Sequence, residues 1–175
     1  MHVMITGGSS GIGAATALAY GRAGARVTIT YNTGADRAAE VVKRIEEAGG
    51  EAAAVHLDLE DHSTIAPAAA QAGPVDALVA NAVRWGTLRP GSVAFEDVPA
   101  AEWSAAMHAN IVGNALLVQA VLPEMRRKGW GRIVFVSSGI AEEGCRGRDR
   151  TAQPRWRCTA WPARWPGRPA RTASW

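Results

Sequence analysis

A glycine-rich stretch at residues 6–13 carries the clearest chemical signal in the sequence. It is Thr-Gly-Gly-Ser-Ser-Gly-Ile-Gly, and it lies between a short apolar run, His2–Thr6, and a segment with helical spacing, Gly11–Ala23. Glycines permit a sharp turn and let a phosphate approach bare backbone, and the free N–H groups of the following helix favour an anion. A strand before the loop and a helix after it favour a dinucleotide-binding loop over a turn that binds nothing.

Four polar residues further along the chain each follow or interrupt an apolar segment. These are Asp58, Asn81, Asn110 and Ser138. Three of them have a purely structural alternative: Asp58 could cap a helix, Asn110 could brace a helix, and Ser138 could be a turn residue. Taken singly, these structural roles are the better interpretation.

The first 144 residues alternate strand-like and helix-like segments. After the glycine loop, the apolar and β-branched runs predict strands at Arg26–Tyr31, Ala52–Leu57, Asp76–Ala80 and Arg132–Ser137. The helical segments between them are Asp36–Ala48, Ser63–Ala72 and a long one from Ala101 to Lys128. Strands separated by helices predict a doubly wound parallel sheet, in the α/β class.

The glycine loop and the four polar residues together resemble the short-chain dehydrogenase/reductase family, in register through residue 144. The loop has the form Thr-Gly-x-x-x-Gly-x-Gly, Asn81-Ala82 resembles the family's Asn-Asn-Ala-Gly motif, and Ser138 ends the fifth predicted strand. Two positions depart from that motif: Ala80 replaces its first Asn and Val83 its Gly. The resemblance implies a Rossmann-type doubly wound sheet, incomplete at about five strands, and a 3-oxoacyl carrier-protein reductase-like activity.

The resemblance also implies roles for individual residues. Ser138 matches the catalytic serine and Asn110 the asparagine of the proton relay. The residues that would contact the cofactor are Thr6, Gly7, Ser9, Ser10, Gly11, Ile12, Gly13, Tyr31, Asn32, Asp58, Leu59, Asn81 and Ala82. No metal site is expected, because the two cysteines, Cys145 and Cys158, lack metal-type spacing.

The end of the second predicted strand bears on the choice of cofactor. An acid there binds the ribose 2′-hydroxyl and selects NAD, whereas this chain has Tyr31-Asn32-Thr33. We therefore expect NADP(H) to be favoured over NAD(H). Arg37 lies close enough in sequence to meet a 2′-phosphate, but it could equally be a solvated helix residue.

The family's catalytic Tyr and Lys have no counterpart in the chain. Thr151 and Arg155 stand at their positions, and the only tyrosines are Tyr20 and Tyr31. The composition also changes at Cys145. The net charge of +3 divides into −4 for residues 1–144, with 11 basic and 15 acidic side chains, and +7 for residues 145–175, with 8 basic and 1 acidic.

A shift of the reading frame accounts for the change of composition at Cys145. Residues 145–175 hold no Leu, Ile or Val, but four Trp and four Pro. If the third base of each codon is joined to the first two of the next, the codons of residues 150–155 permit Tyr-Ser-Thr-Ala-Lys, the family's missing pattern. We expect residues 1–144 to form a dinucleotide-binding domain and residues 145–175 to be a frameshifted, disordered tail. The loss of one base near the codon of Gly144 would cause the shift.

The expected function is therefore an NADP(H)-dependent oxidoreductase acting on a small carbonyl or alcohol substrate, inactive as this chain. One alternative is a catalytically dead NADP(H)-binding module. Another is a nucleic-acid or membrane role for the basic, Trp-rich tail. We expect neither nucleic acid nor membrane as a partner, since the body of the chain is acidic and its apolar runs are short. A cytoplasmic location is expected because no basic-then-apolar leader begins the sequence. Intact members of the family that the chain resembles are usually homo-oligomers.

Overall fold

A computed structural model describes residues 1–86 and 95–137 of the chain. The first half contains β1 (His2–Ile5), α1 (Gly11–Arg22), β2 (Arg26–Tyr31), α2 (Ala35–Glu47), β3 (Glu51–His56), a 3₁₀ turn (His62–Thr64), α3 (Ile65–Ala72) and β4 (Ala77–Ala80). A second 3₁₀ turn (Phe95–Asp97), α4 (Ala100–Met107), α5 (Asn114–Arg127) and β5 (Arg132–Phe135) follow.

The five strands form one parallel sheet in the order β3-β2-β1-β4-β5. Ile5 of β1 pairs with Ile29 of β2 on one side and with Val79 of β4 on the other. The direction of winding reverses between β1 and β4, which is the point where doubly wound sheets open a crevice for ligands. The predicted fold class, an incomplete Rossmann-type sheet, is confirmed.

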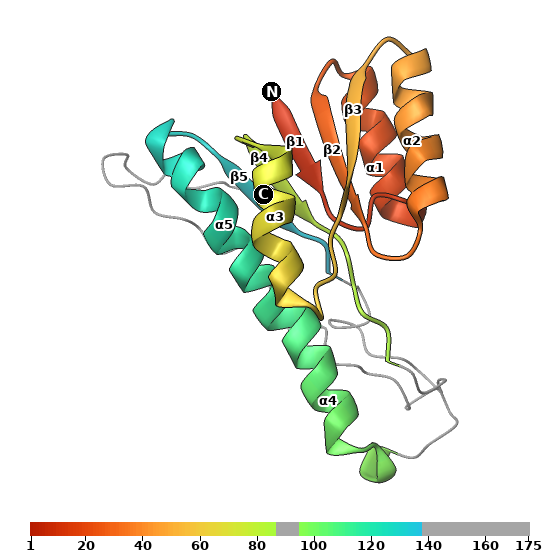
Figure 1. Cartoon of the computed structure of the whole chain (residues 1–175), viewed down its shortest axis with the longest axis vertical. Coiled ribbons are helices and arrows are strands. Elements are labelled where there is room, and N and C mark those ends of the chain that lie inside the picture. Colours follow the sequence, from red (N-terminus) through yellow and green to blue (C-terminus); the bar gives the residue numbers. More distant parts are fainter. Residues whose placement is uncertain (87–94, 138–175) are drawn as a thin grey trace, which may run out of the picture.

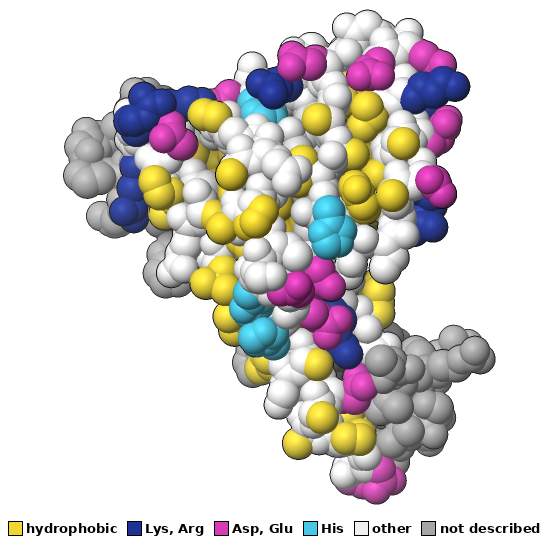
Figure 2. Space-filling view, in the orientation of Figure 1, with side chains coloured by type: hydrophobic (Ala, Val, Ile, Leu, Met, Phe, Trp, Pro, Cys, Tyr) yellow, Lys and Arg dark blue, Asp and Glu magenta, His cyan; other side chains and the backbone are white. Residues whose placement is uncertain are grey.

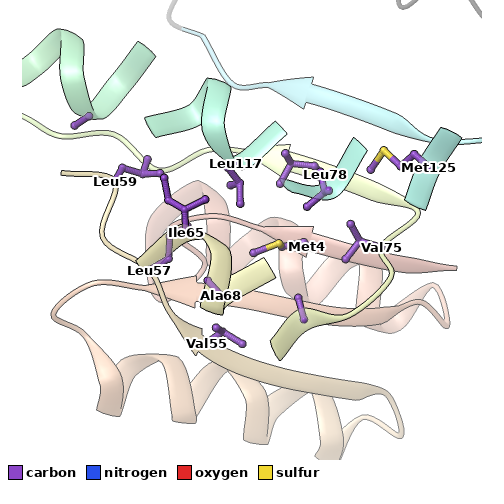
Figure 3. Close-up of a cluster of buried hydrophobic side chains, with 13 residues drawn as sticks. Met4, Val55, Leu57, Leu59, Ile65, Ala68, Val75, Leu78, Leu117 and Met125 are labelled. Atoms are coloured by element: carbon purple, nitrogen blue, oxygen red, sulfur yellow. The ribbon is translucent and has the colours of Figure 1, made fainter. Parts of the chain in front are cut away.

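Helices cover both faces of the sheet, with α1 and α2 on one face and α3 and α5 on the other (Figure 1). Alternate residues of a strand point to opposite faces, so β1 contributes to both hydrophobic cores. Val3 and Ile5 pack with Val27, Ile29 and Ile45 under α1 and α2. The other core contains Met4, Leu78, Leu117, Val121 and Met125 (Figure 3).

The long helix predicted at 101–128 is present as Ala100–Arg127. A π-helical segment within it, His108–Gly113, separates α4 from α5. Gly113 lies so close to the preceding β3–α3 connection that a Cβ on it would stand 2.6 Å from the carbonyl oxygen of Leu59. Single π-turns within α-helices occur often at functional sites.

The continuous helix Ala100–Arg127 is 28 residues long and, by length and composition only, could cross a membrane. In the fold it serves another purpose. Leu117, Val121 and Met125 of its second half are almost fully buried against the sheet and α3. This contact is what a core helix of a doubly wound sheet requires, and it accounts for the apolar residues of α5; α4 has no buried residue.

His2 is a buried polar residue in the first strand. Its Nδ1 lies 3.0 Å from the carbonyl oxygen of Pro74, which can only accept, so Nδ1 carries the proton. Nε2 then accepts a hydrogen bond from the Thr28 hydroxyl at 2.8 Å. Burial lowers the pKa of His2 below its usual value, and the nearby Arg26 adds to the effect, against the hydrogen bond to Pro74. The fold therefore favours neutral His2.

Candidate functional site

A cleft of about 680 Å³ opens at the carboxyl ends of the strands, where the winding reverses between β1 and β4. Its walls come from the β1–α1 loop, the ends of β2, β3 and β4, and the region where α4 meets the π segment. The volume falls within the usual range of roughly 300–1,000 Å³ for ligand pockets. The chain thus brings its sequence motifs to one edge of the sheet.

The glycine loop forms the floor of this cleft. Gly7 and Gly11 adopt positive φ angles of 65° and 53°, which side chains other than glycine rarely tolerate. A Cβ on Gly13 would lie 2.3 Å from the carbonyl oxygen of Gly7, so the first turn of α1 packs directly on the loop backbone. At Gly11, by contrast, an added Cβ would have no heavy atom within 4 Å. The backbone is therefore bare where a ligand would approach.

The first turn of α1 presents its N–H groups to the cleft. Ser10 occupies the cap position without making a side-chain cap hydrogen bond, and Ser10, Gly11 and Ile12 all line the cleft. The first N–H groups of a helix have no partner within the helix, and its dipole is positive at this end. The loop and helix end therefore fit a diphosphate group in both shape and charge.

Thr6 and Asn81 tie this loop to the end of β4. The Thr6 hydroxyl, which is fully buried, accepts the backbone N–H of Asn81 and of Ala82, both at 2.9 Å. The Asn81 side-chain amide donates to the carbonyl oxygens of Thr6 and Gly7 at 3.0 and 3.4 Å. The two sides of the winding reversal are thus hydrogen-bonded together beneath the cleft.

The end of β2 and the segment after β3 line one end of the cleft. Tyr31 and Asn32 stand there with Asp58, whose Oδ1 accepts the backbone N–H of Glu60 at 2.8 Å. The structure excludes Asp58 as the helix cap, since the 3₁₀ turn after it is capped by Asp61 instead. Arg37 also lines this end.

The Arg37 guanidinium packs over the backbone of Gly34, between β2 and α2. A Cβ on Gly34 would lie 2.6 Å from Nη2 of Arg37. The arginine is therefore folded back toward the cleft rather than extended along the outer face of α2, and it brings a positive charge to the end of β2.

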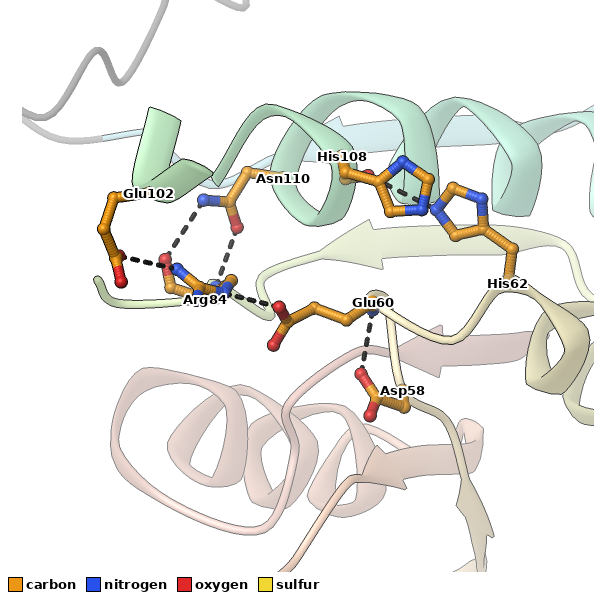
Figure 4. A network of polar contacts seen from close by, with 7 residues as sticks. All are labelled: Asp58, Glu60, His62, Arg84, Glu102, His108 and Asn110. Carbon is orange, nitrogen blue, oxygen red and sulfur yellow. Dashed lines mark hydrogen bonds and ion pairs between the residues drawn. The ribbon is translucent and has the colours of Figure 1, made fainter. Parts of the chain in front are cut away.

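Asn110 lies in the π segment and joins the long helix to the β4 exit. Its Oδ1 accepts the backbone N–H of Arg84 at 2.7 Å, and its Nδ2 donates to the Arg84 carbonyl at 3.1 Å (Figure 4). Asn110 therefore has the bracing role that the sequence left open, and it connects the π segment to the chain that follows β4. The Asn110 carbonyl accepts the Asn114 side-chain amide at 2.9 Å, while Asn114 Oδ1 is buried without a hydrogen-bond partner.

Arg84 itself is held between two carboxylates. Its Nε donates to Glu60 at 2.6 Å and its Nη1 to Glu102 at 3.5 Å, with only 15% of the arginine side chain exposed. The hydrogen bond to Glu60 raises the pKa of Arg84, against the opposing effect of desolvation. Next to this network, the rings of His62 and His108 stack with centroids 3.9 Å apart (Figure 4).

Most of the residues singled out from the sequence reach the cleft. Those that line it are Gly7, Ser9, Ser10, Gly11, Ile12, Tyr31, Asn32, Asp58, Leu59, Asn81, Ala82 and Asn110. Thr6 and Gly13 are buried beneath the loop and support it. Ser138 lies outside the described residues, although its neighbour Ser137 lines the cleft. In the described part of the chain, no group of three or more His, Cys, Asp or Glu is placed to hold a metal ion.

Sequence reasoning missed Arg84, Trp85, Glu102 and Trp103, all at the β4 and α4 side of the site. One signal was available: Arg84 is a charged residue directly after an apolar strand and the Asn-Ala pair. Its partners could not be identified, because Glu60 and Glu102 are distant in sequence and neither stands in a motif.

A model of the family described as short chain dehydrogenase matches residues 1–148. The chain belongs to the short chain dehydrogenase family. One relative is the 7α-hydroxysteroid dehydrogenase of Escherichia coli K12. It is 34% identical to this chain over 143 residues, which are 79% of this chain and 53% of that protein. The chain spans about half the length of the curated relatives it matches.

Solved structures of the family superpose well on the chain. A 3-ketoacyl-ACP reductase from Sinorhizobium meliloti 1021 has a TM-score of 0.73 at 33% identity, covering 81% of this chain and 55% of that one. A 7α-hydroxysteroid dehydrogenase complexed with NADH and 7-oxo glycochenodeoxycholic acid has a TM-score of 0.72 at 33% identity, covering 82% of this chain and 55% of that one. A metagenomic short-chain oxidoreductase in complex with NADP has a TM-score of 0.71 at 34% identity, covering 79% and 61%. Members similar to this chain thus bind either nicotinamide cofactor.

Proposed function

We propose that this chain is the cofactor-binding portion of an NADP(H)-dependent short-chain carbonyl reductase or alcohol dehydrogenase, and that the 175-residue polypeptide binds the cofactor without turning it over. The observation that carries the proposal is the open glycine cradle at the winding reversal. Bare backbone at Gly11, an α1 N-terminus without a side-chain cap and the Thr6–Asn81 tie together suit a dinucleotide diphosphate.

The preference for NADP(H) rests on the end of β2. No carboxylate is present at residues 31–33 to bind a ribose 2′-hydroxyl, and the Arg37 guanidinium lies over Gly34 at the same end of the cleft. A guanidinium recognises phosphate through charge-assisted hydrogen bonds. The likeness to both an NADH-bound and an NADP-bound structure leaves this preference to experiment.

The chemistry requires a hydride carrier, a proton donor and a donor for the developing alkoxide. A bound nicotinamide supplies or accepts the hydride. Asn110 and Ser138 are our candidates for proton relay and for positioning the carbonyl, in line with the family pattern. Thr151 and Arg155 stand where the family has Tyr and Lys, and a threonine hydroxyl at position 151 lacks the acidity of the tyrosine phenol that donates the proton. We therefore propose that residues 145–175 are out of frame.

Titration of the purified chain with NADPH and NADH, followed by calorimetry, tests this proposal. NADPH should bind more tightly than NADH. Arg37→Ala should weaken NADPH about tenfold or more, because a hydrogen bond to a charged group contributes about 1.5–3 kcal/mol, and should leave NADH unchanged. Arg44→Ala, on the last turn of the same helix α2, is the matched control.

The complementary change introduces a carboxylate at the end of β2. Tyr31→Asp should reverse the preference toward NADH by repelling a 2′-phosphate and accepting from a 2′-hydroxyl. Equal affinities of the unmodified chain for both cofactors, or no effect of Arg37→Ala, would contradict the proposed preference. Failure to bind either cofactor would contradict the proposed function itself.

A further inference from the structure

Large apolar side chains line the cleft on the side of α4, beyond Asn110. They are Trp85, Trp103, Met107 and Ile111, from the β4 exit and from the helix that carries Asn110. Trp85 is 66% exposed, and Met107 and Ile111 are each 38% exposed. On the face shown in Figure 2, hydrophobic side chains are likewise scattered along α4, next to a group of acidic ones. We call these four residues the aromatic wall.

Single exposed apolar side chains are ordinary on protein surfaces. The aromatic wall differs because its four members line one concave site, which also contains the glycine loop and Asn110. Two indoles and two aliphatic side chains in a cleft are suited to a flat, apolar ligand, since indole gives a large and rigid contact area. The position in a cleft favours a small molecule over a protein or a membrane surface.

The two tryptophans belong to segments that an ion pair joins. Arg84 directly precedes Trp85, Glu102 directly precedes Trp103, and Arg84 Nη1 donates to Glu102 at 3.5 Å. The Asn110 side chain also holds the Arg84 backbone through two hydrogen bonds (Figure 4). The β4 exit and α4 are thus fixed relative to each other, so the wall is organised before a ligand binds, which lowers the entropy lost on binding.

The positive charge at this side of the cleft is already compensated within the protein. Arg84 is neutralised by Glu60 and Glu102, so its guanidinium is engaged within the protein rather than presented to a ligand. A negatively charged ligand group would meet two carboxylates here. An uncharged ring therefore fits the aromatic wall better than an anionic chain.

We propose that the aromatic wall is the substrate subsite, and that it takes an uncharged, flat, ring-containing ketone or the matching secondary alcohol. This proposal rests on the proposed function, because the cofactor would hold the reacting carbon beside Asn110. Trp85 is then a specificity-determining residue. Its indole would lie against the ring of the substrate, with Met107 and Ile111 completing the apolar contact.

The test uses the 175-residue chain with and without NADPH, and two uncharged ketones, 2-acetylnaphthalene and 2-butanone. Ligand affinity is measured by saturation-transfer NMR or calorimetry. The aromatic ketone should bind at least tenfold more tightly than the aliphatic one. Trp85→Ala should weaken the aromatic ketone about two- to tenfold, the range expected for loss of an aromatic pair, and should leave NADPH affinity unchanged. Trp85→Phe should retain most of the affinity.

Trp130→Ala is the matched control, because Trp130 is also an exposed tryptophan, at 43%, but it precedes β5 at the amino ends of the strands, away from the cleft at their carboxyl ends. Unchanged ketone affinity in a folded Trp85→Ala variant, with the fold checked by circular dichroism, would overturn the proposal. So would a change of oligomeric state without a change in ketone affinity. If the ketone binds at Trp85 while NADPH does not bind at all, the subsite stands and the proposed function fails.

Discussion

Replacing Thr6 by valine probes how the two halves of the sheet are joined below the cleft. The exchange keeps the shape of the side chain and substitutes a methyl group for the hydroxyl. That hydroxyl accepts two backbone N–H groups, those of Asn81 and Ala82, at 2.9 Å each. Thr6 is fully buried, so water cannot readily replace the lost acceptor.

The magnitude follows from these two donors. A buried donor left without a partner costs about 1–3 kcal/mol, so the loss of the acceptor for two donors in Thr6→Val should lower the free energy of unfolding by about 2–6 kcal/mol. A domain of this kind is stable by only about 5–15 kcal/mol in total. Thr6→Ser keeps the acceptor and removes one methyl group, and should lower the free energy by about 1 kcal/mol.

Urea unfolding followed by circular dichroism measures both variants, and NADPH titration reports on the loop above Thr6. Thr6→Val should also weaken NADPH, because Asn81 holds the carbonyl groups of Thr6 and Gly7. The serine variant should bind normally. If valine and serine at this position destabilise the protein equally, the hydroxyl does not carry the tie and the reasoning is refuted.

Three further outcomes are expected. Burial lowers the pKa of His2, so below the usual pKa of 6.5 the unfolded chain binds more protons than the folded one. The free energy of unfolding should therefore fall as the pH drops through 6.5. His2→Gln should remove the contribution of His2 to this pH dependence, measured by urea unfolding between pH 7 and pH 5. Gly13→Ala places a Cβ 2.3 Å from the Gly7 carbonyl and should cost about 1–3 kcal/mol with loss of cofactor binding, and an unchanged melting temperature would contradict the packing described. Inserting one base near the codon of Gly144 should restore a Tyr-x-x-x-Lys pattern and ketone reduction with NADPH, which Ser138→Ala should then slow about 10²–10³-fold; an inactive repaired protein would count against the frame shift.

The elements of this fold were predictable from sequence because its strands are short, apolar and separated by amphipathic helices. Arg26–Tyr31 was located without error, β1 and α1 differ from expectation by one residue at one end, and α2 and β3 by one residue at each end. Burial on both faces of a parallel sheet leaves continuous apolar runs, which are easy to recognise. The glycine loop was recognisable because its flanking elements were.

The β4–α4 side of the site could not be predicted in the same way. The π segment at His108–Gly113 changes the helical pattern by a single residue, and no residue type signals it. The Arg84 network joins three segments whose proximity depends on the closed fold. For Asn110 the sequence suggested a role in proton relay, whereas its side-chain contacts are made with the Arg84 backbone, a partner that sequence cannot specify.

The pairing of Asn110 with the main chain of residue 84 has a consequence for how the family can diversify. Both hydrogen bonds end on backbone atoms, so they place no demand on which side chain follows the β4 loop. A lineage can therefore exchange that side chain, and its neighbours, while the helix stays anchored at the same spot. This chain has Ala80 and Val83 where the family motif has Asn and Gly, and the anchor is present in it. The backbone hydrogen bonds that anchor the helix are thus independent of the side chains that line the cleft. Substitutions can change which ligand the cleft accepts while the position of the helix stays the same.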